Sequence, residues 1–186
     1  MVSDVTSPDR YARPVAKAIL LTGPVGVGKT TTLHEIEALL DAGRVPNAIL
    51  DLDWLAWATP ARGTAHDLLV RNLADVWRNL HDAGIAHVAM ARMLHDEGEI
   101  ADVRAALAGC ETFTVELALD MDELRERIRR RDSGVELAEH LAYLDRWAGM
   151  ADGLRADAVI PVDGRTPAEV ARDVLGVAGW ALERRD

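Results

Sequence analysis

The glycine-rich stretch LLTGPVGVGKTTTLHEI, residues 20–36, combines the residue types that proteins use to hold a phosphate chain. Gly23 and Gly28 are separated by four residues, and Lys29 and Thr30 follow at once, which matches the motif G-x-x-x-x-G-K-[ST] without a departure. Glycines allow backbone N–H groups to turn toward phosphate oxygens, while the lysine reaches the terminal phosphates and the threonine hydroxyl binds Mg²⁺. The motif therefore predicts a nucleotide site. Its loop is completed by Pro24, Val25, Gly26, Val27 and Thr31.

The segments on either side of this loop are the ones that a phosphate loop needs. The apolar run AILLT predicts a strand before it, and TTTLHEIEALLDAG predicts an amphipathic helix after it, whose N-terminus adds a positive dipole. A glycine-rich turn between a strand and a helix also occurs as turn chemistry alone. The complete motif in this context favours phosphate binding.

Short apolar runs alternate with longer amphipathic segments along the rest of the chain. Nearly continuous apolar strands are typical of a parallel sheet that helices cover on both faces, with right-handed crossovers between strands. The sequence therefore predicts one α/β domain over residues 16–186, preceded by a polar tail at residues 1–15. The predicted strands are 18–22, 48–53, 86–91, 112–119 and 157–162, and the predicted helices are 30–43, 64–84, 96–109, 121–132, 136–149 and 166–182.

Composition limits the partners of the chain. A formal net charge of −10 argues against binding an extended nucleic acid, whose phosphates require a basic surface. No stretch approaches the roughly 20 apolar residues of a membrane span, so we expect no membrane partner. The six histidines show no metal-ligand spacing, and we interpret them as structural or surface residues. The single cysteine, Cys110, permits no internal disulfide and fits a reducing compartment, from which we predict a cytoplasmic protein.

The stretches AILLTGPVGVGKTTTLHEIEALL, AILDLDWL and IPVDGRTPAEVARDVL resemble those of the P-loop small-molecule kinases related to adenylylsulfate kinase, gluconate kinase and chloramphenicol phosphotransferase. The resemblance covers most of the chain from about residue 17 onward. It implies a three-layer α/β sandwich with a five-stranded parallel sheet and a helical lid at about residues 121–148. It also implies ATP and Mg²⁺ as cofactors and a small molecule as the phosphoryl acceptor.

Asp51 and Asp53 stand at the end of the second predicted strand, where alternation points both side chains to the same side. The resemblance implies a carboxylate here that lies across the cleft from the γ-phosphate and accepts a proton from the acceptor hydroxyl or helps to order Mg²⁺. Capping of the following segment WLAWA is the alternative for one or both. We predict Asp53 as the base, with Asp51 as a second catalytic carboxylate, and we predict Thr30 and Asp51 as the metal ligands. Adenylylsulfate kinases carry Asp-Gly-Asp-Asn here, and the departure to Asp51-Leu52-Asp53-Trp54 disfavours adenylylsulfate itself as the acceptor.

The acceptor is expected beyond the carboxyl ends of the strands, where open α/β sheets bind their ligands. Trp54 and Trp57 follow the second strand and can either stack on a flat acceptor or pack in the core. Arg71 and Arg92 are candidates for fixing a polar substrate, with solvent exposure as the alternative for each. The third strand ends in Ala91-Arg92 and lacks the Asp of a Walker B motif, which argues against a motor-type ATPase.

The run RERIRRR, residues 125–131, holds five arginines and follows the fourth predicted strand, where the similar kinases carry their lid. Arg125 and Arg129 share one helix face, and Arg127 and Arg131 share another. Lid arginines would close over the phosphates and neutralise charge in the transition state, whereas a mixed-charge helix can also be simply solvated. We predict that Arg125 and Arg129 bind the phosphates, with Arg129 in a catalytic role.

The stretch VDGRTP, residues 162–167, follows the last predicted strand. The resemblance implies that this loop borders the adenine, so we predict nucleotide contacts for Gly164 and Arg165. The same residues also make an ordinary turn with Thr166 as the N-cap of the last helix, and both interpretations can hold together.

These residues together predict an ATP- and Mg²⁺-dependent kinase that transfers the γ-phosphoryl group to a hydroxyl of a small molecule. The alternative is a nucleotide-binding regulatory or switch ATPase without such an acceptor, which the missing Walker B aspartate keeps open. The sequence contains no Asn/Thr-Lys-x-Asp guanine motif, which favours ATP over GTP. Neither the acceptor nor the oligomeric state follows from the sequence.

Overall fold

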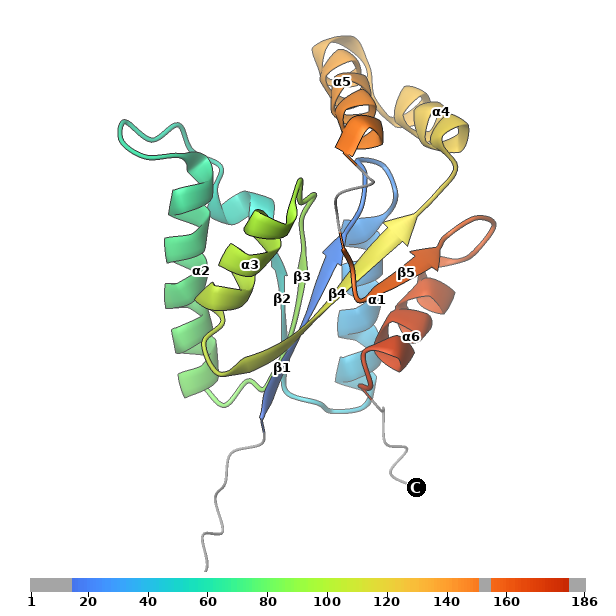
Figure 1. Cartoon of the computed structure of the whole chain (residues 1–186). Helices are drawn as coiled ribbons and strands as arrows, with labels where there is room; N and C mark the ends of the chain where they lie inside the picture. Colours follow the sequence, from blue (N-terminus) through green and yellow to red (C-terminus); the bar gives the residue numbers. More distant parts are fainter. Residues whose placement is uncertain (1–14, 151–154, 181–186) are drawn as a thin grey trace, which may run out of the picture.

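The computed structural model describes residues 15–150 and 155–180 of the 186-residue chain. The described part contains a five-stranded parallel sheet in the order β2-β3-β1-β4-β5 (Figure 1), which confirms the predicted sheet. Apart from Val15, the predicted tail at residues 1–15 lies outside the described residues. The strands are β1 (Ala16–Thr22), β2 (Asn47–Asp51), β3 (His87–Ala91), β4 (Cys110–Ala118) and β5 (Ala158–Pro161).

Helices cover both faces of the sheet and form two hydrophobic cores (Figure 1). One face packs against α1 (Lys29–Ala42) and α6 (Pro167–Val177), and the other packs against α2 (Ala65–Asp82) and α3 (Glu97–Ala106). The central strand β1 supplies both cores: Ile19 and Leu21 point into the first, and Ala18 and Leu20 point into the second. Burial on both faces explains why this strand is a continuous apolar run.

The helix starts follow from local hydrogen bonding. Thr64 and Asp67 form a reciprocal capping box at the start of α2, as the sequence predicts, and Thr166 and Glu169 form another at the start of α6, beside Pro167. In each box a side-chain oxygen satisfies a backbone N–H that the first helical turn leaves free. These caps fix where the loops before α2 and α6 end.

The second strand is shorter than predicted. β2 ends at Asp51, because the Asp51 carboxylate accepts the backbone N–H of Asp53 at 3.1 Å and starts the short 3-10 helix η1 (Leu52–Leu55). Asp53 therefore belongs to η1 and not to the strand. The segment WLAWA, residues 54–58, which we considered as a helix capped by one of these aspartates, forms no α-helix.

Two further helices, α4 (Met121–Arg131) and α5 (Gly134–Met150), lie beyond the carboxyl ends of the strands (Figure 1), and we call them the lid helices. Leu124 and Ile128 of α4 are fully buried in the same core as Val27 of the phosphate loop. This packing holds α4 against the edge of the sheet where a ligand is expected. Among the described helices, none is long and apolar enough to cross a membrane.

Candidate active site

The phosphate loop joins β1 to α1, and its shape depends on glycine. Gly23 has a φ of 133°, and a Cβ atom there would lie 2.5 Å from the Leu117 carbonyl oxygen of β4. Gly26 has a φ of 83°, and a Cβ atom there would lie 3.1 Å from the Ile128 side chain of the lid helix α4. The loop is thus confined between the sheet and α4, with its backbone close to both.

Lys29 begins α1 and turns its side chain back over the loop. Its ammonium group donates to the carbonyl oxygens of Gly23 at 2.9 Å and Pro24 at 3.0 Å. Burial lowers the pKa of Lys29 to about 8, although the nearby carboxylates of Asp53 and Asp51 raise it. A partly desolvated cation at this place gains from an anionic ligand.

Thr30 and Asp51 form a pair of oxygen donors beside the loop. The Thr30 hydroxyl donates to Asp51 Oδ2 at 3.2 Å, while Asp51 Oδ1 accepts the backbone N–H of Asp53. Asp51 therefore caps η1 and reaches Thr30 at the same time. A hydroxyl and a carboxylate are hard oxygen ligands of the kind that Mg²⁺ prefers, so this pair fits the metal.

Asp53 and Arg92 form an ion pair across the ends of β2 and β3. Arg92 Nη1 donates to Asp53 Oδ1 at 2.8 Å, and the Arg92 backbone N–H donates to the Leu21 carbonyl oxygen at 3.0 Å. Loss of water around Asp53 raises the pKa of its carboxyl above the ordinary value of 3.8, and the Arg92 charge acts in the opposite direction. The Asp53 side chain is 69% exposed, so this single bond places its carboxylate beside a half-buried cation without enclosing it.

A cavity of about 900 Å³ brings Lys29, Thr30, Asp53 and Arg92 together, whereas Asp51 is not among its lining residues. Its wall includes the phosphate loop and the start of α1 over residues 25–32, together with Asp53, Arg92 and Arg165. Arg165 follows β5 and is fixed by an ion pair with Asp173 at 2.6 Å. The remaining lining residues on the β5–α6 side are Val162, Pro167 and Val170, and the others are Met93, His95, Arg127, Arg131, Glu136, His140 and Tyr143.

The structure does not bring every predicted site residue to this cavity. Trp54 in η1 and Trp57 just after it are exposed and lie against each other with ring centroids 4.8 Å apart. Arg71 is exposed on α2, where its Nε donates to the Asp67 carbonyl oxygen at 3.3 Å. Gly23 and Pro24 accept the hydrogen bonds of Lys29 through their carbonyl oxygens but do not line the cavity. Gly164 does not line it either.

The lid arginines that face the cavity are Arg127 and Arg131, not the predicted Arg125 and Arg129. Arg125 joins the two lid helices by pairing with Asp145, and Arg129 pairs with Glu126 on the outer face. The physical reason is the orientation of α4. Leu124 and Ile128 pack inward, and Arg127 and Arg131, three positions after them, border the cavity, whereas Arg125 lies on the side toward α5. The lid arginines at the cavity are therefore Arg127 and Arg131.

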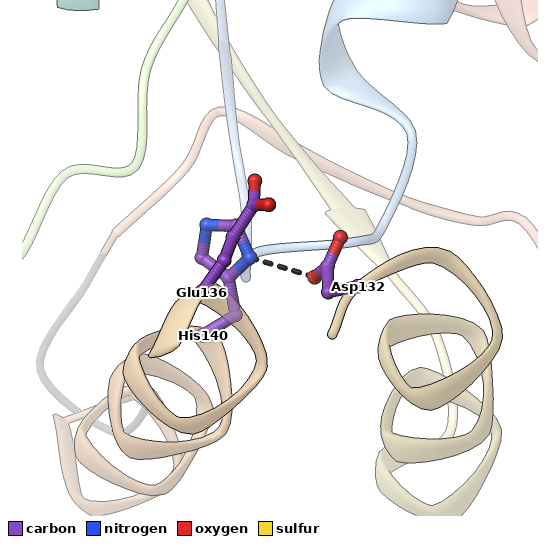
Figure 2. A group of neighbouring side chains, drawn as sticks. All are labelled: Asp132, Glu136 and His140. Carbon is purple, nitrogen blue, oxygen red and sulfur yellow. Dashed lines mark hydrogen bonds and ion pairs between the residues drawn. The ribbon is translucent and has the colours of Figure 1, made fainter. Parts of the chain in front are cut away.

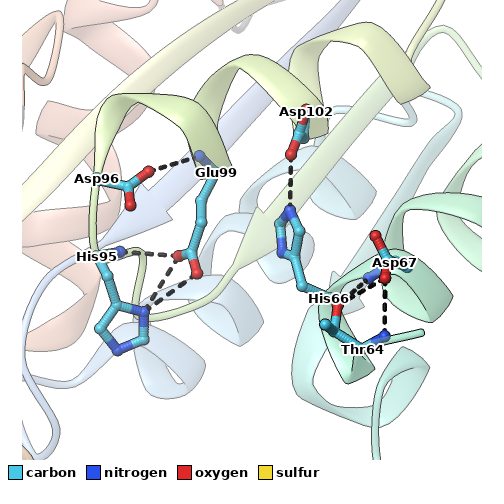
Figure 3. Close-up of polar contacts among 7 residues, drawn as sticks. All are labelled: Thr64, His66, Asp67, His95, Asp96, Glu99 and Asp102. Carbon is cyan, nitrogen blue, oxygen red and sulfur yellow. Dashed lines mark hydrogen bonds and ion pairs between the residues drawn. The ribbon is translucent and has the colours of Figure 1, made fainter. Parts of the chain in front are cut away.

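Two histidines that we interpreted as structural or surface residues, His95 and His140, also line the cavity. His95 Nδ1 lies 3.1 Å from a carboxylate oxygen of Glu99, which also accepts the His95 backbone N–H at 2.8 Å (Figure 3). His66 lies elsewhere, and its ring contacts Asp102 at 3.0 Å, linking α2 to α3 (Figure 3). His95 follows β3 closely, at the edge of the sheet where ligands bind, and this position in the sequence indicates a site residue.

Asp132, Glu136 and His140 form a cluster in which one potential ligand atom from each lies within 4.8 Å of the others (Figure 2). The Asp132 carboxylate already accepts Arg131 Nε at 2.6 Å, Arg131 Nη2 at 2.9 Å and His140 Nδ1 at 2.7 Å. The hydrogen bonds from Arg131, followed by the one from His140, hold the pKa of Asp132 at about 2. Arg131 therefore already bonds to the carboxylate oxygens that a metal ion would need. We interpret the cluster as a contact that anchors Arg131 and not as a metal site.

The pKa of Lys29 makes nucleotide affinity depend on pH. Below about pH 8 the lysine is charged with or without ligand, so we expect a flat affinity for MgATP from about pH 7 to pH 8. At pH values above 8 the free protein has a neutral Lys29. The bound phosphates raise the pKa of Lys29, so binding must take up a proton, and affinity should fall by up to about tenfold per pH unit. Calorimetric titration with MgATP at a series of pH values measures this. Lys29→Met should bind MgATP more weakly, and its affinity should not decline above pH 8. A wild-type affinity that stays flat to about pH 9.5 would contradict the assignment of Lys29 to the phosphates.

Comparisons with known proteins place this geometry in a known fold. No protein-family model matches the chain. The cytochrome c biogenesis ATP-binding export protein CcmA of Rhodobacter capsulatus is 33% identical over 85 residues, which are 45% of this chain and 38% of that protein. The match thus spans well under half the length of that relative.

Solved structures match over nearly the whole chain. The tunicamycin resistance protein of Deinococcus radiodurans is 19% identical, with a TM-score of 0.61 over 88% of this chain and 96% of that one. The APS kinase CysC of Mycobacterium tuberculosis, in complex with AMPPNP and APS, is 19% identical, with a TM-score of 0.62 over 89% and 99%. A gluconokinase from Sinorhizobium meliloti 1021 is 20% identical, with a TM-score of 0.54 over 89% and 93%. The fold is that of the P-loop small-molecule kinases, as the sequence resemblance predicts.

Proposed function

We propose that the protein is an ATP- and Mg²⁺-dependent kinase that transfers the γ-phosphoryl group to a hydroxyl of a small molecule. One observation carries this proposal: the phosphate-loop Lys29 and the Asp53 carboxylate line the same cavity of about 900 Å³. The cavity has the volume of a small-molecule site, and it joins a phosphate-binding wall to a wall with a base. A protein that only binds a nucleotide has no need of the second wall.

The nucleotide is held by groups on the α1 side of the cavity. The amides of the phosphate loop and the N-terminus of α1 bind the phosphate oxygens, and Lys29 reaches the β- and γ-phosphates. Val162 and Arg165, at the loop between β5 and α6, border the adenine of the nucleotide. Thr30 and Asp51 hold Mg²⁺, which when bound neutralises charge on the phosphates.

The transfer step uses groups on the opposite wall. The acceptor hydroxyl gives its proton to Asp53 as its oxygen bonds to the γ-phosphorus, and the bond from that phosphorus to the β–γ bridging oxygen of ATP breaks, leaving ADP. The raised pKa of Asp53 makes it a stronger base, and Arg92 donates a hydrogen bond to its carboxylate. Arg127 and Arg131 on the lid stabilise the charge on the transferred group.

The proposal predicts acceptor-dependent ADP release by the purified protein with ATP and Mg²⁺. The panel comprises adenylylsulfate, nucleosides, sugar acids, tunicamycin, and aminoglycoside and phenicol antibiotics. We expect strong stimulation by at least one compound and its loss in Lys29→Ala, which removes the phosphate-loop cation. Circular dichroism of Lys29→Ala confirms that it is folded. Undiminished turnover in that variant would contradict the assignment.

A second candidate is a nucleotide-dependent switch that hydrolyses ATP slowly without an acceptor. The match to an export ATPase over 45% of the chain favours it, and the third strand, which ends without an acidic Walker B residue, is consistent only with slow hydrolysis. Its signature is tight ATP binding with a slow ADP release that no compound in the panel changes. That result would favour the switch over the kinase.

A further inference from the structure

Asp132 lies at the joint between the two lid helices and is almost completely enclosed. It directly follows Arg131, and its backbone N–H donates to the Ile128 carbonyl oxygen at the end of α4. Its side chain is 3% exposed, and all three side-chain hydrogen bonds that it accepts come from Arg131 and His140. Figure 2 shows the one from His140. One carboxylate thus ties the last residue of α4 to the middle of α5.

This contact fixes an arginine that would otherwise be free. A terminal arginine on a helix samples many rotamers, but the planar guanidinium is held when two parallel donors meet one carboxylate. Arg131 uses Nε and Nη2 for Asp132, and among the described residues Nη1 has no protein acceptor. Arg131 also lines the cavity that Lys29 lines. A pre-oriented donor is therefore left for an anion in that cavity.

The other lid arginine at the cavity is held less firmly. Arg127 makes a single hydrogen bond to Glu123, at 2.8 Å, on its own helix, and both side chains are half-buried. One bond between two flexible side chains fixes a guanidinium less firmly than two parallel bonds to one enclosed carboxylate. The contrast identifies Arg131 as the arginine whose geometry is set before a ligand binds.

We propose that Asp132 is a positioning residue of the nucleotide site, which holds Arg131 with its free nitrogen available to the γ-phosphate, while His140 fastens this contact to α5. The inference rests on the proposed function only in that the cavity binds a nucleoside triphosphate. Asp132 touches no ligand itself and acts through Arg131. Its loss should therefore have the same effect as the loss of Arg131.

The test compares the affinities of AMPPNP and ADP, each with Mg²⁺, by calorimetry. Wild type should prefer AMPPNP, and Arg131→Gln should lose about tenfold of that preference, because one charge-assisted hydrogen bond to the γ-phosphate is removed. Asp132→Asn should lose a similar factor with unchanged ADP affinity, and the double variant should lose no more than either. Additive losses, or a folded Asp132→Asn protein with wild-type preference, would overturn the proposal.

Two further measurements separate positioning from general stability. Millimolar guanidinium should restore the AMPPNP preference of Arg131→Ala and should fail to do so when Asp132→Asn is added, because the carboxylate that holds the guanidinium is gone. Asp122→Asn is the matched control, since this carboxylate pairs with Arg125 on the same helix and does not line the cavity. Rescue that does not depend on Asp132, or a loss of preference in Asp122→Asn, would count against the proposal.

The outcomes also separate this inference from the kinase assignment. An AMPPNP preference that depends on Asp132, in a protein that phosphorylates no acceptor, refutes the kinase and supports the positioning role. If the protein phosphorylates an acceptor and its AMPPNP preference does not change when Asp132 is replaced, the kinase assignment is supported and the positioning role is refuted. If Asp132→Asn does not fold, Asp132→Glu keeps the charge and should retain part of the preference, and a complete loss in a folded Asp132→Glu protein would contradict the inference.

Discussion

Asp53→Asn should lower kcat by about 100- to 10,000-fold while leaving the KM for MgATP nearly unchanged. The substitution keeps the shape of the side chain, and its amide oxygen can still accept the hydrogen bond from Arg92 that the carboxylate accepts at 2.8 Å. What it removes is the ability to take the proton of the acceptor hydroxyl. The loss should therefore fall on the chemical step, and steady-state kinetics with the best acceptor from the panel measures it.

Asp51→Asn is the matched comparison. Asp51 bonds to the Thr30 hydroxyl, so its loss should weaken the metal site and raise the Mg²⁺ concentration needed for half-maximal rate. An Asp53→Asn rate within about threefold of wild type, with Asp51→Asn strongly impaired in kcat at saturating Mg²⁺, would exchange the roles of the two aspartates.

The sheet and the phosphate loop follow from the sequence because both depend on local chemistry. Burial of β1 on both faces requires a continuous apolar run, and the positive φ of Gly23 beside a backbone oxygen of β4 requires glycine. In these places the sequence pattern and the structure have the same physical cause, so the pattern predicts the structure. The same holds for the capping box at Thr64, where the residue types fix the helix start.

The cavity wall follows less well because it depends on long-range packing. Alternation predicted that Asp51 and Asp53 share a face, but a side-chain hydrogen bond ends the strand at Asp51 and places Asp53 in a different element. Helical spacing predicted two arginine faces on the lid. Choosing between them required the contact of Ile128 with the loop at Gly26, which no local pattern contains.

That contact leads to the second large effect. Arg131→Gln should reduce kcat by about 100-fold or more, because Arg131 lines the cavity and carries charge that the transferred phosphoryl group needs in the transition state. Arg129→Gln is the matched control on the same helix, two residues away. Its guanidinium pairs with Glu126 on the outer face, an exposed contact that contributes little, so its kcat should stay within about twofold of wild type.

The pair of variants tests the orientation of the lid helix directly. Both remove one positive charge from α4, so the change in net charge is the same for the two. Arg131 also bonds to buried Asp132, so circular dichroism must first show that both variants are folded. A difference between the folded variants in single-turnover rate then reports which of the two arginines meets the cavity. Equal losses would mean that α4 turns when the nucleotide binds, and a loss confined to Arg129→Gln would restore the assignment that helical spacing alone suggested.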